Sequence, residues 1–78
     1  MKRARLSELR PGMWAVIAQI AEGVPDLTRL RELGLLPGAR IQFVRRAPLG
    51  DPVEISVRGA LLSLRDREAA FIEVDCLP

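Results

Sequence analysis

The stretch from residue 27 to residue 57 constrains the fold of this chain more than any other part of it. It opens with a leucine at every third position, which is the spacing of a short helix with one apolar face: Leu27, Leu30 and Leu33. Asp26 stands before them as the predicted N-cap. Gly34 follows at the left-handed position just past a helix end, where glycine is favoured. The pattern predicts a helix with an abrupt end.

The residues after Gly34 predict how the chain turns back. If Gly34 is left-handed, Leu35 can fold onto Leu30, which is the apolar contact that accompanies this kind of helix end. Pro37-Gly38 then predicts a tight turn. Residues 47–52 hold two prolines and a Gly-Asp pair, so they predict a second loop.

Apolar residues elsewhere recur with the period of two that marks a half-buried strand. The predicted inward sets are Ile41 and Phe43; Val53, Ile55 and Val57; Ala60, Leu62 and Leu64; and Ala70, Ile72 and Val74. Residues 13–20, rich in β-branched and small apolar side chains, predict one more strand, buried in the core. The chain is thus expected to be mainly β, with about five strands.

The remaining segments are short. Residues 1–5 are basic and are expected to be loose, whereas Leu6 and Leu9 should face the core from a helical turn that ends at Pro11-Gly12. Residues 66–69 predict a polar turn. Five short strands with little helix in 78 residues indicate one domain, residues 1–78, closed into a small barrel that hides its strand edges.

The composition excludes several classes of function. The chain has no histidine and one cysteine, Cys76, so it lacks the usual general base and cannot form an internal disulfide. No nucleophile–base pair is visible, and Gly34 to Gly38 lacks the Lys-Ser or Lys-Thr of a phosphate-binding loop. No apolar stretch reaches the roughly 20 residues of a membrane span, and no signal peptide is visible. We expect a cytoplasmic protein that is not an enzyme and has no cofactor.

The chain resembles the FeoA family of small cytosolic accessory proteins of bacterial ferrous iron transport. The resemblance runs from Leu6 to Val74. The segments that carry it are Leu6-Ser7-Glu8-Leu9-Arg10-Pro11-Gly12, Leu33-Gly34-Leu35-Leu36-Pro37-Gly38, Arg46-Ala47-Pro48-Leu49-Gly50-Asp51-Pro52, Leu64-Arg65 and Ala69-Ala70-Phe71-Ile72-Glu73-Val74.

The resemblance implies an SH3-like barrel with one helix inserted after the first strand. It also implies a role in supporting the membrane protein FeoB, whose cytosolic part carries a GTP-binding domain. One departure from many relatives is Ala60, where they carry a larger side chain after the Arg-Gly bend. If that position touches the partner, contact there is reduced or different.

A docking surface for FeoB can be predicted from the leucines around the helix end. Leu30 and Leu33 are expected in the core, and Leu36 and also Leu35 are expected to be partly exposed because a small barrel cannot absorb all four. Leu49 is expected nearby, and Phe71 should point outward if its neighbours point inward. The predicted partner-binding residues are Leu35, Leu36, Leu49, Phe71, Arg45 and Arg46. The alternative is that these leucines fill the core or are singly exposed.

Two other functions stay open. Glu73, Asp75 and Cys76 could hold a transition metal, but without histidine or a CxxC pair no metal site is predicted. Seven arginines could form a basic face for nucleic acid. They are Arg29, Arg31, Arg45, Arg46, Arg58, Arg65 and Arg67. One tryptophan and two phenylalanines, however, offer little base stacking. No nucleic acid partner is therefore expected.

Overall fold

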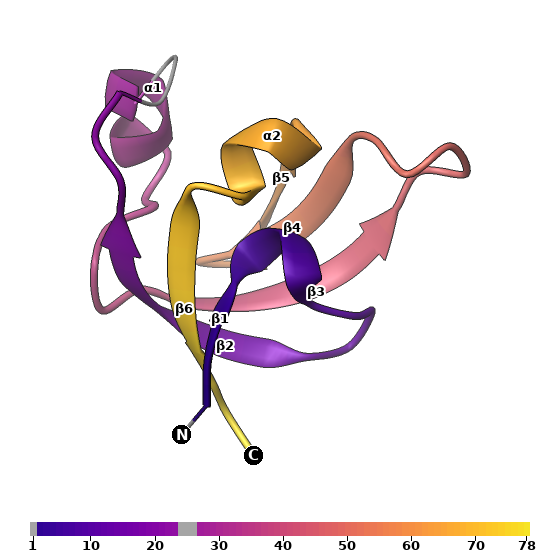
Figure 1. Ribbon diagram of the computed structural model, residues 1–78, viewed down its shortest axis with the longest axis horizontal. Coiled ribbons are helices and arrows are strands. Elements are labelled where there is room, and N and C mark those ends of the chain that lie inside the picture. The colour runs from indigo at the N-terminus through magenta and orange to yellow at the C-terminus, as the bar shows by residue number, and fades with distance from the viewer. Residues whose placement is uncertain (1, 24–26) are drawn as a thin grey trace.

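The computed structural model describes residues 2–23 and 27–78, which form one antiparallel sheet with short helices at its ends (Figure 1). The sheet has six strands in the order β1-β6-β2-β3-β4-β5. The elements, in chain order, are β1 (Lys2–Arg5), the 3₁₀ helix η1 (Leu6–Glu8), β2 (Trp14–Ile20), α1 (Leu27–Glu32), β3 (Arg40–Arg46), β4 (Val53–Val57), β5 (Ala60–Leu64), α2 (Asp66–Ala69) and β6 (Ile72–Cys76).

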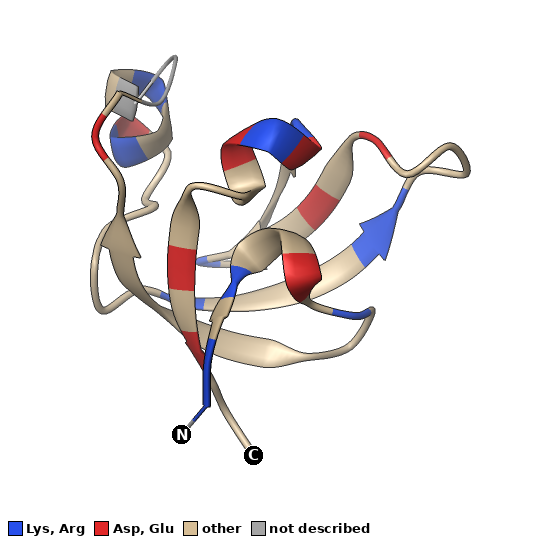
Figure 2. Cartoon of the chain, viewed as in Figure 1, with Lys and Arg blue, Asp and Glu red and all other residues tan. Residues whose placement is uncertain are grey.

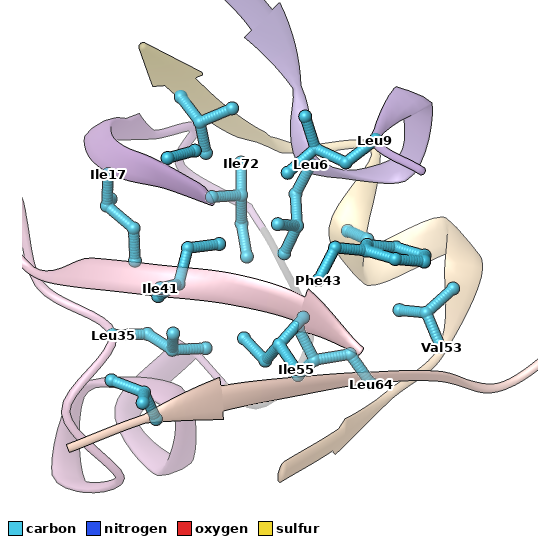
Figure 3. Packing of buried hydrophobic residues seen from close by; sticks show 14 of the residues in the cluster. Leu6, Leu9, Ile17, Leu35, Ile41, Phe43, Val53, Ile55, Leu64 and Ile72 are labelled. Atoms are coloured by element: carbon cyan, nitrogen blue, oxygen red, sulfur yellow. The ribbon is translucent and has the colours of Figure 1, made fainter. Parts of the chain in front are cut away.

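The core is aliphatic and follows the period of two in the sequence. Predicted inward residues of β3, β4 and β6 are buried, and Phe43 is the largest side chain among them. The core is closed by leucines from η1 and from the end of α1 (Figure 3). Burial of each such side chain contributes about 1.5–3 kcal/mol, so a few of them account for much of the stability of a small domain.

Two β-bulges curve the sheet. The register shifts between Ile17 and Gln19 where β2 meets β6, and between Phe43 and Arg45 where β3 meets β4. A bulge bends its strand and increases the twist, and this wraps the sheet around its core. Within the described residues β1 and β5 are edges that do not pair with each other, so the predicted small barrel is present as an open, curved sheet.

The prediction of a loose N-terminus is wrong for residues 2–5. They form β1, which pairs with β6 from Lys2 opposite Cys76 to Arg5 opposite Glu73, and Arg3 Nε donates to Asp75 Oδ1 at 2.8 Å. The strand was missed because its residues are polar and mostly exposed, so no apolar alternation marks it. The chain therefore has six strands, and the inserted helix α1 follows the second.

The turns behave largely as predicted. Leu6 of η1 and Leu9 directly after it are buried, and residues 66–69 form the single helical turn α2. The Glu68 side chain accepts from the Arg65 N–H at 3.0 Å and lies 3.6 Å from Arg29 of α1. The ion pair links the two α-helices across the end of the sheet. The N-cap predicted at Asp26 lies outside the described residues.

Strands β2 and β5 are less buried than predicted. In β2 only Ala15 and Ile17 belong to the buried core, because alternate side chains point outward. In β5 Leu64 is buried and Leu62 packs against the core, but Ala60 is exposed beside the turn. None of the described helices is long and apolar enough to span a membrane.

Candidate partner-binding surface

The turn after α1 is a helix cap around which two of the four leucines are buried and two are exposed. Gly34 has φ +99°, its N–H donates to the Arg31 oxygen at 3.0 Å, and the Leu35 N–H donates to the Leu30 oxygen at 3.0 Å. These are the two hydrogen bonds of a Schellman motif. Leu30 and Leu35 are both 0% exposed, so the predicted fold-back of Leu35 toward Leu30 agrees with the structure.

The exposure predicted for two of these leucines is wrong. Leu35 is buried and cannot serve as a contact, while Leu33, expected in the core, is 44% exposed. The cap reverses the chain at Gly34, so the next residue turns inward and the last helical positions face solvent. Leu36 is 40% exposed, as predicted. A small apolar surface remains at the helix exit, which we call the exit patch: Leu33 and Leu36.

The exit patch lies against the turn between β4 and β5. A Cβ built on Gly34 would stand 3.7 Å from the Arg58 side chain and 3.8 Å from that of Val57. Arg58 has φ +52° and Gly59 has φ +80°, which is the backbone of a two-residue hairpin turn. Arg58 is exposed, and its guanidinium begins beside Gly34, which stands between the two leucines in the chain.

Leu49 is not near the exit patch. It is 97% exposed in the β3–β4 loop, whereas Leu36 precedes the start of β3. The six residue steps of β3 separate the two by about 20 Å, and Figure 1 shows α1 and this loop at opposite sides of the molecule. The prediction that Leu49 lies beside Leu36 is wrong because strand β3 keeps its ends apart.

The two predicted arginine contacts have different surroundings. Arg46 donates to the oxygens of Ser7 (2.6 Å), Gly50 (3.1 Å) and Asp66 (2.6 Å), and its guanidinium lies 5.5 Å from the centre of the Phe43 ring. It ties η1, the β3–β4 loop and α2 together.

Arg45 is exposed and hydrogen-bonds the Glu54 carboxylate; this bond and the carboxylate charge raise the pKa of Arg45 above its ordinary value. Arg45 thus projects from the sheet, while Arg46 is held within the fold.

Phe71 stands in a third region. It is 44% exposed in the turn between α2 and β6, and its oxygen accepts from the Ala21 N–H at 2.9 Å. A hollow of about 560 Å³ adjoins it, with lining residues Arg3, Ala4, Arg5, Glu8, Ala21, Ala70, Phe71 and Glu73. The predicted site residues therefore lie in three separate places.

The carboxylates of Glu73 and Asp75, near the C-terminus, form ion pairs with Arg3 of β1. Arg3 lies 2.8 Å from Asp75 and 3.7 Å from Glu73, and both contacts raise the pKa of Arg3, the hydrogen bond to Asp75 most. In residues 2–23 and 27–78 no three Cys, Asp or Glu side chains gather as a metal-binding group. Basic and acidic residues are both scattered along the ribbon, and the basic ones do not gather in one region (Figure 2).

Sequence reasoning missed one exposed aromatic side chain. Trp14 is 41% exposed at the start of β2, and the Arg40 guanidinium lies 4.8 Å from the centre of its ring. The prediction of a buried strand over residues 13–20 is wrong at Trp14, although the alternation of Trp14 with the small, buried Ala15 indicates an outward side chain.

The six-stranded curved sheet with its short helices defines a small β domain of the SH3-like class. Residues 4–76 match the model of the FeoA domain, and the chain belongs to this family.

Similar proteins agree with that membership. The Fe(2+) transport protein A/Fe(2+) transporter FeoB fusion protein of Porphyromonas gingivalis is 40% identical over 73 residues, which are 94% of this chain and 9% of that protein. The chain thus spans only about a tenth of that relative's length.

The solution structure of FeoA from Chlorobium tepidum is 41% identical, with a TM-score of 0.89 over 96% of this chain and 71% of that one. FeoA of Stenotrophomonas maltophilia, described as an SH3 domain protein and solved with zinc, is 33% identical, with a TM-score of 0.76 over 92% of this chain and 89% of that one.

Proposed function

We propose that this chain is a non-enzymatic, cytoplasmic accessory protein of ferrous iron uptake that docks on the cytosolic GTP-binding region of a FeoB transporter. The observation that carries the proposal is the P. gingivalis relative, in which an FeoA segment similar to this chain is fused to FeoB. Joining two modules in one chain gives each a high effective concentration near the other. We infer that the FeoA domain and FeoB act on each other through a binding surface on this domain.

The exit patch is the first part of that surface. Leu33 and Leu36 are each at least 40% exposed, and Arg58 lies against the same turn. Apolar side chains bordered by arginine are typical of the core and rim of protein interfaces. The Schellman cap fixes the backbone here, so little conformational entropy is lost when a partner covers it.

The other predicted contacts extend the proposal to two further places. Leu49 and Arg45 project from the β3–β4 end, and Phe71 borders the hollow beside β1. Arg46 has its hydrogen bonds inside the fold, so its role at an interface is to hold the β3–β4 loop in place. A partner about as large as a GTP-binding domain reaches more than one of these places.

Docking regulates the transporter only if it distinguishes two states of FeoB. A bound protein shifts an equilibrium by its difference in affinity for the two states and by nothing else. We propose that the chain binds one nucleotide state of the GTP-binding region more tightly and favours the state competent for iron import.

An NMR titration tests this function. The ¹⁵N-labelled chain is titrated with the unlabelled cytosolic region of the cognate FeoB, once with a non-hydrolysable GTP analogue and once with GDP. We expect shifts that cluster at Leu33, Leu36 and Arg58 and that saturate at lower concentration in one state. Absence of shifts in both states would contradict the proposed function.

A metal-binding regulatory module is the second candidate, since the S. maltophilia relative was solved with zinc. In this chain Glu73 and Asp75 both contact Arg3, so a metal ion would have to compete with an ion pair. Calorimetry with zinc and with ferrous iron, on the wild type and on Cys76→Ser, separates the candidates. Tight binding lost in Cys76→Ser would favour the metal module.

A further inference from the structure

The outer face of strands β2 and β3 carries an aromatic–arginine pair that the fold does not need. Ala15, Ile17 and Ile41 point into the core, so Trp14 and Arg40 point away from it. Trp14 is partnered with Gln42 and Val16 with Arg40, which places Arg40 diagonally across from Trp14 on one face. In Figure 1 both α-helices lie above the sheet, on the other side from the middle of β2.

The pair is held in place before any partner arrives. The Trp14 oxygen accepts from the Leu77 N–H at 2.9 Å, and the Gln42 side chain donates to the Gly12 oxygen at 3.4 Å. The Arg40 guanidinium stacks 4.8 Å from the centre of the indole ring. A guanidinium held over an aromatic ring still has the N–H groups of its edge available, and these can bind a carboxylate through two hydrogen bonds.

Arg40 lacks a counter-ion among the described residues. The acidic residue in the same row of the sheet is Asp75, which is partnered with Val16, but Arg3 already binds its carboxylate at 2.8 Å. Arg40 forms no ion pair with a described carboxylate, in contrast to Arg3, Arg45 and Arg46. A stacked arginine without an acid beside it has the charge to complement an acid from another molecule.

We propose that Trp14 and Arg40 form a carboxylate-binding anchor for an acidic residue of the transporter partner, with an apolar neighbour of that residue covering the indole ring. The inference rests on the proposed function and names a second contact in the same interface. The Gly38 N–H donates to the Ile17 oxygen at 2.7 Å, so the turn that holds Leu36 runs directly into the β2–β3 ladder. Four residue steps, at most about 13 Å, separate Leu36 from Arg40, so one partner surface reaches both.

Two other occupants fit less well. Anionic membranes are recognised by clusters of about four to eight basic residues. Of the described basic residues, the rows around Trp14 on β2 and β3 hold Arg40 alone, and Arg3, which lies in the same row on β1, is paired with Glu73 and Asp75. A second copy would have to supply a free carboxylate, and the acidic residue in the same row of the sheet, Asp75, is already bound by Arg3. An acidic protein segment meets neither objection.

The test compares matched variants in calorimetric titrations with the cytosolic region of FeoB. Arg40→Gln removes the charge but keeps a polar side chain, Arg40→Lys keeps the charge but loses the fork, and Arg67→Gln on α2 removes the same charge elsewhere. We expect about ten-fold weaker binding for Arg40→Gln and Trp14→Ala, an intermediate loss for Arg40→Lys, and less than a two-fold change for Arg67→Gln. Circular dichroism confirms that each variant is folded.

The outcomes separate the anchor from the proposed function. If the wild type binds and all four variants bind equally well, the anchor is wrong and the docking function stands. If the wild type does not bind the FeoB region at all, the docking function fails, and the anchor that rests on it fails with it.

The indole N–H of the sole tryptophan gives one NMR signal in the labelled chain. We expect it to shift when the FeoB region is added. A shift produced instead by phosphatidylserine vesicles, or by raising the concentration of the chain alone, would overturn the proposal in favour of a lipid or a second copy.

Discussion

Two proline- and glycine-bounded turns of this chain, at opposite ends of strand β3, are anchored by different physics. The helix-exit turn is held by apolar burial, with Leu30 and Leu35 fully inside and two cap hydrogen bonds above them. The β3–β4 loop is held by polar contacts: Arg46 donates to backbone oxygens and a carboxylate, and the Asp51 side chain accepts from the Asp66 N–H at 3.0 Å. Its leucine, Leu49, is 97% exposed. The same residue type is therefore core in one turn and free surface in the other.

The difference teaches what each turn can offer a partner. In the exit turn, the buried leucines and the cap hydrogen bonds fix the backbone that carries Leu36. Leu36 can therefore serve as a rigid apolar contact. The β3–β4 loop presents Leu49 alone, with no neighbour that packs around it in the core cluster. An isolated exposed leucine is common on protein surfaces, whereas a fixed pair beside an arginine has the features of an interface centre.

The largest expected effect comes from the apolar anchor. Leu35→Ala removes a fully buried side chain from the core, and we expect a loss of about 3 kcal/mol in the free energy of unfolding. Urea denaturation followed by circular dichroism measures it. Leu36→Ala is the matched control on the next residue and should cost less than about 1 kcal/mol. Equal losses for the two leucines would show that the cap does not sort them as described.

The polar anchor comes next. Arg46→Ala removes charge-assisted hydrogen bonds to Ser7, Gly50 and Asp66, and we expect a loss of about 2 kcal/mol. Arg45→Ala, one residue earlier and exposed, breaks only a surface ion pair with Glu54 and should cost about 0–1 kcal/mol. The same denaturation experiment applies. A loss at Arg45 as large as that at Arg46 would remove the distinction between the two arginines.

The smallest effect concerns a feature that both turns have, a glycine in the left-handed conformation. Gly34 has φ +99° and Gly50 has φ +92°, and a Cβ at either position makes no close contact. Gly34→Ala and Gly50→Ala should each cost about 1–2 kcal/mol from left-handed strain alone. Thermal unfolding of both variants measures the costs side by side. A much larger loss of stability at Gly34 than at Gly50 would mean that the burial of Leu30 and Leu35 also depends on the geometry of the cap.

Local rules accounted for much of this fold. Alternation located β3, β4 and β6, and the rule for glycine after a helix located the cap at Gly34 and the inward turn of Leu35. The expected exposure of Leu35 came from an argument about core volume, and the cap rule that contradicted it was correct. Hydrogen-bond geometry at a helix end is local and is therefore encoded nearby.

What the sequence did not reveal depends on residues far apart in the chain. Strand β1 exists because Lys2–Arg5 meets β6 more than 60 residues later, and its polar side chains carry no sign of that pairing. The separation of Leu36 from Leu49 likewise depends on the length and direction of β3. The stacking of Arg40 on Trp14 requires the register of β2 against β3, which alternation within one strand does not specify.

The central claim is that the exit patch, and not the β3–β4 loop, is the main contact with FeoB. The most direct test is the affinity of Leu36→Asp and of Leu49→Asp for the FeoB cytosolic region, measured by calorimetry beside the wild type. Both variants place the same carboxylate at an exposed leucine and should stay folded. We predict at least about ten-fold weaker binding for Leu36→Asp and a smaller loss, within about three-fold, for Leu49→Asp, which lies at a secondary contact. Unchanged binding by Leu36→Asp, or a loss confined to Leu49→Asp, would contradict the claim.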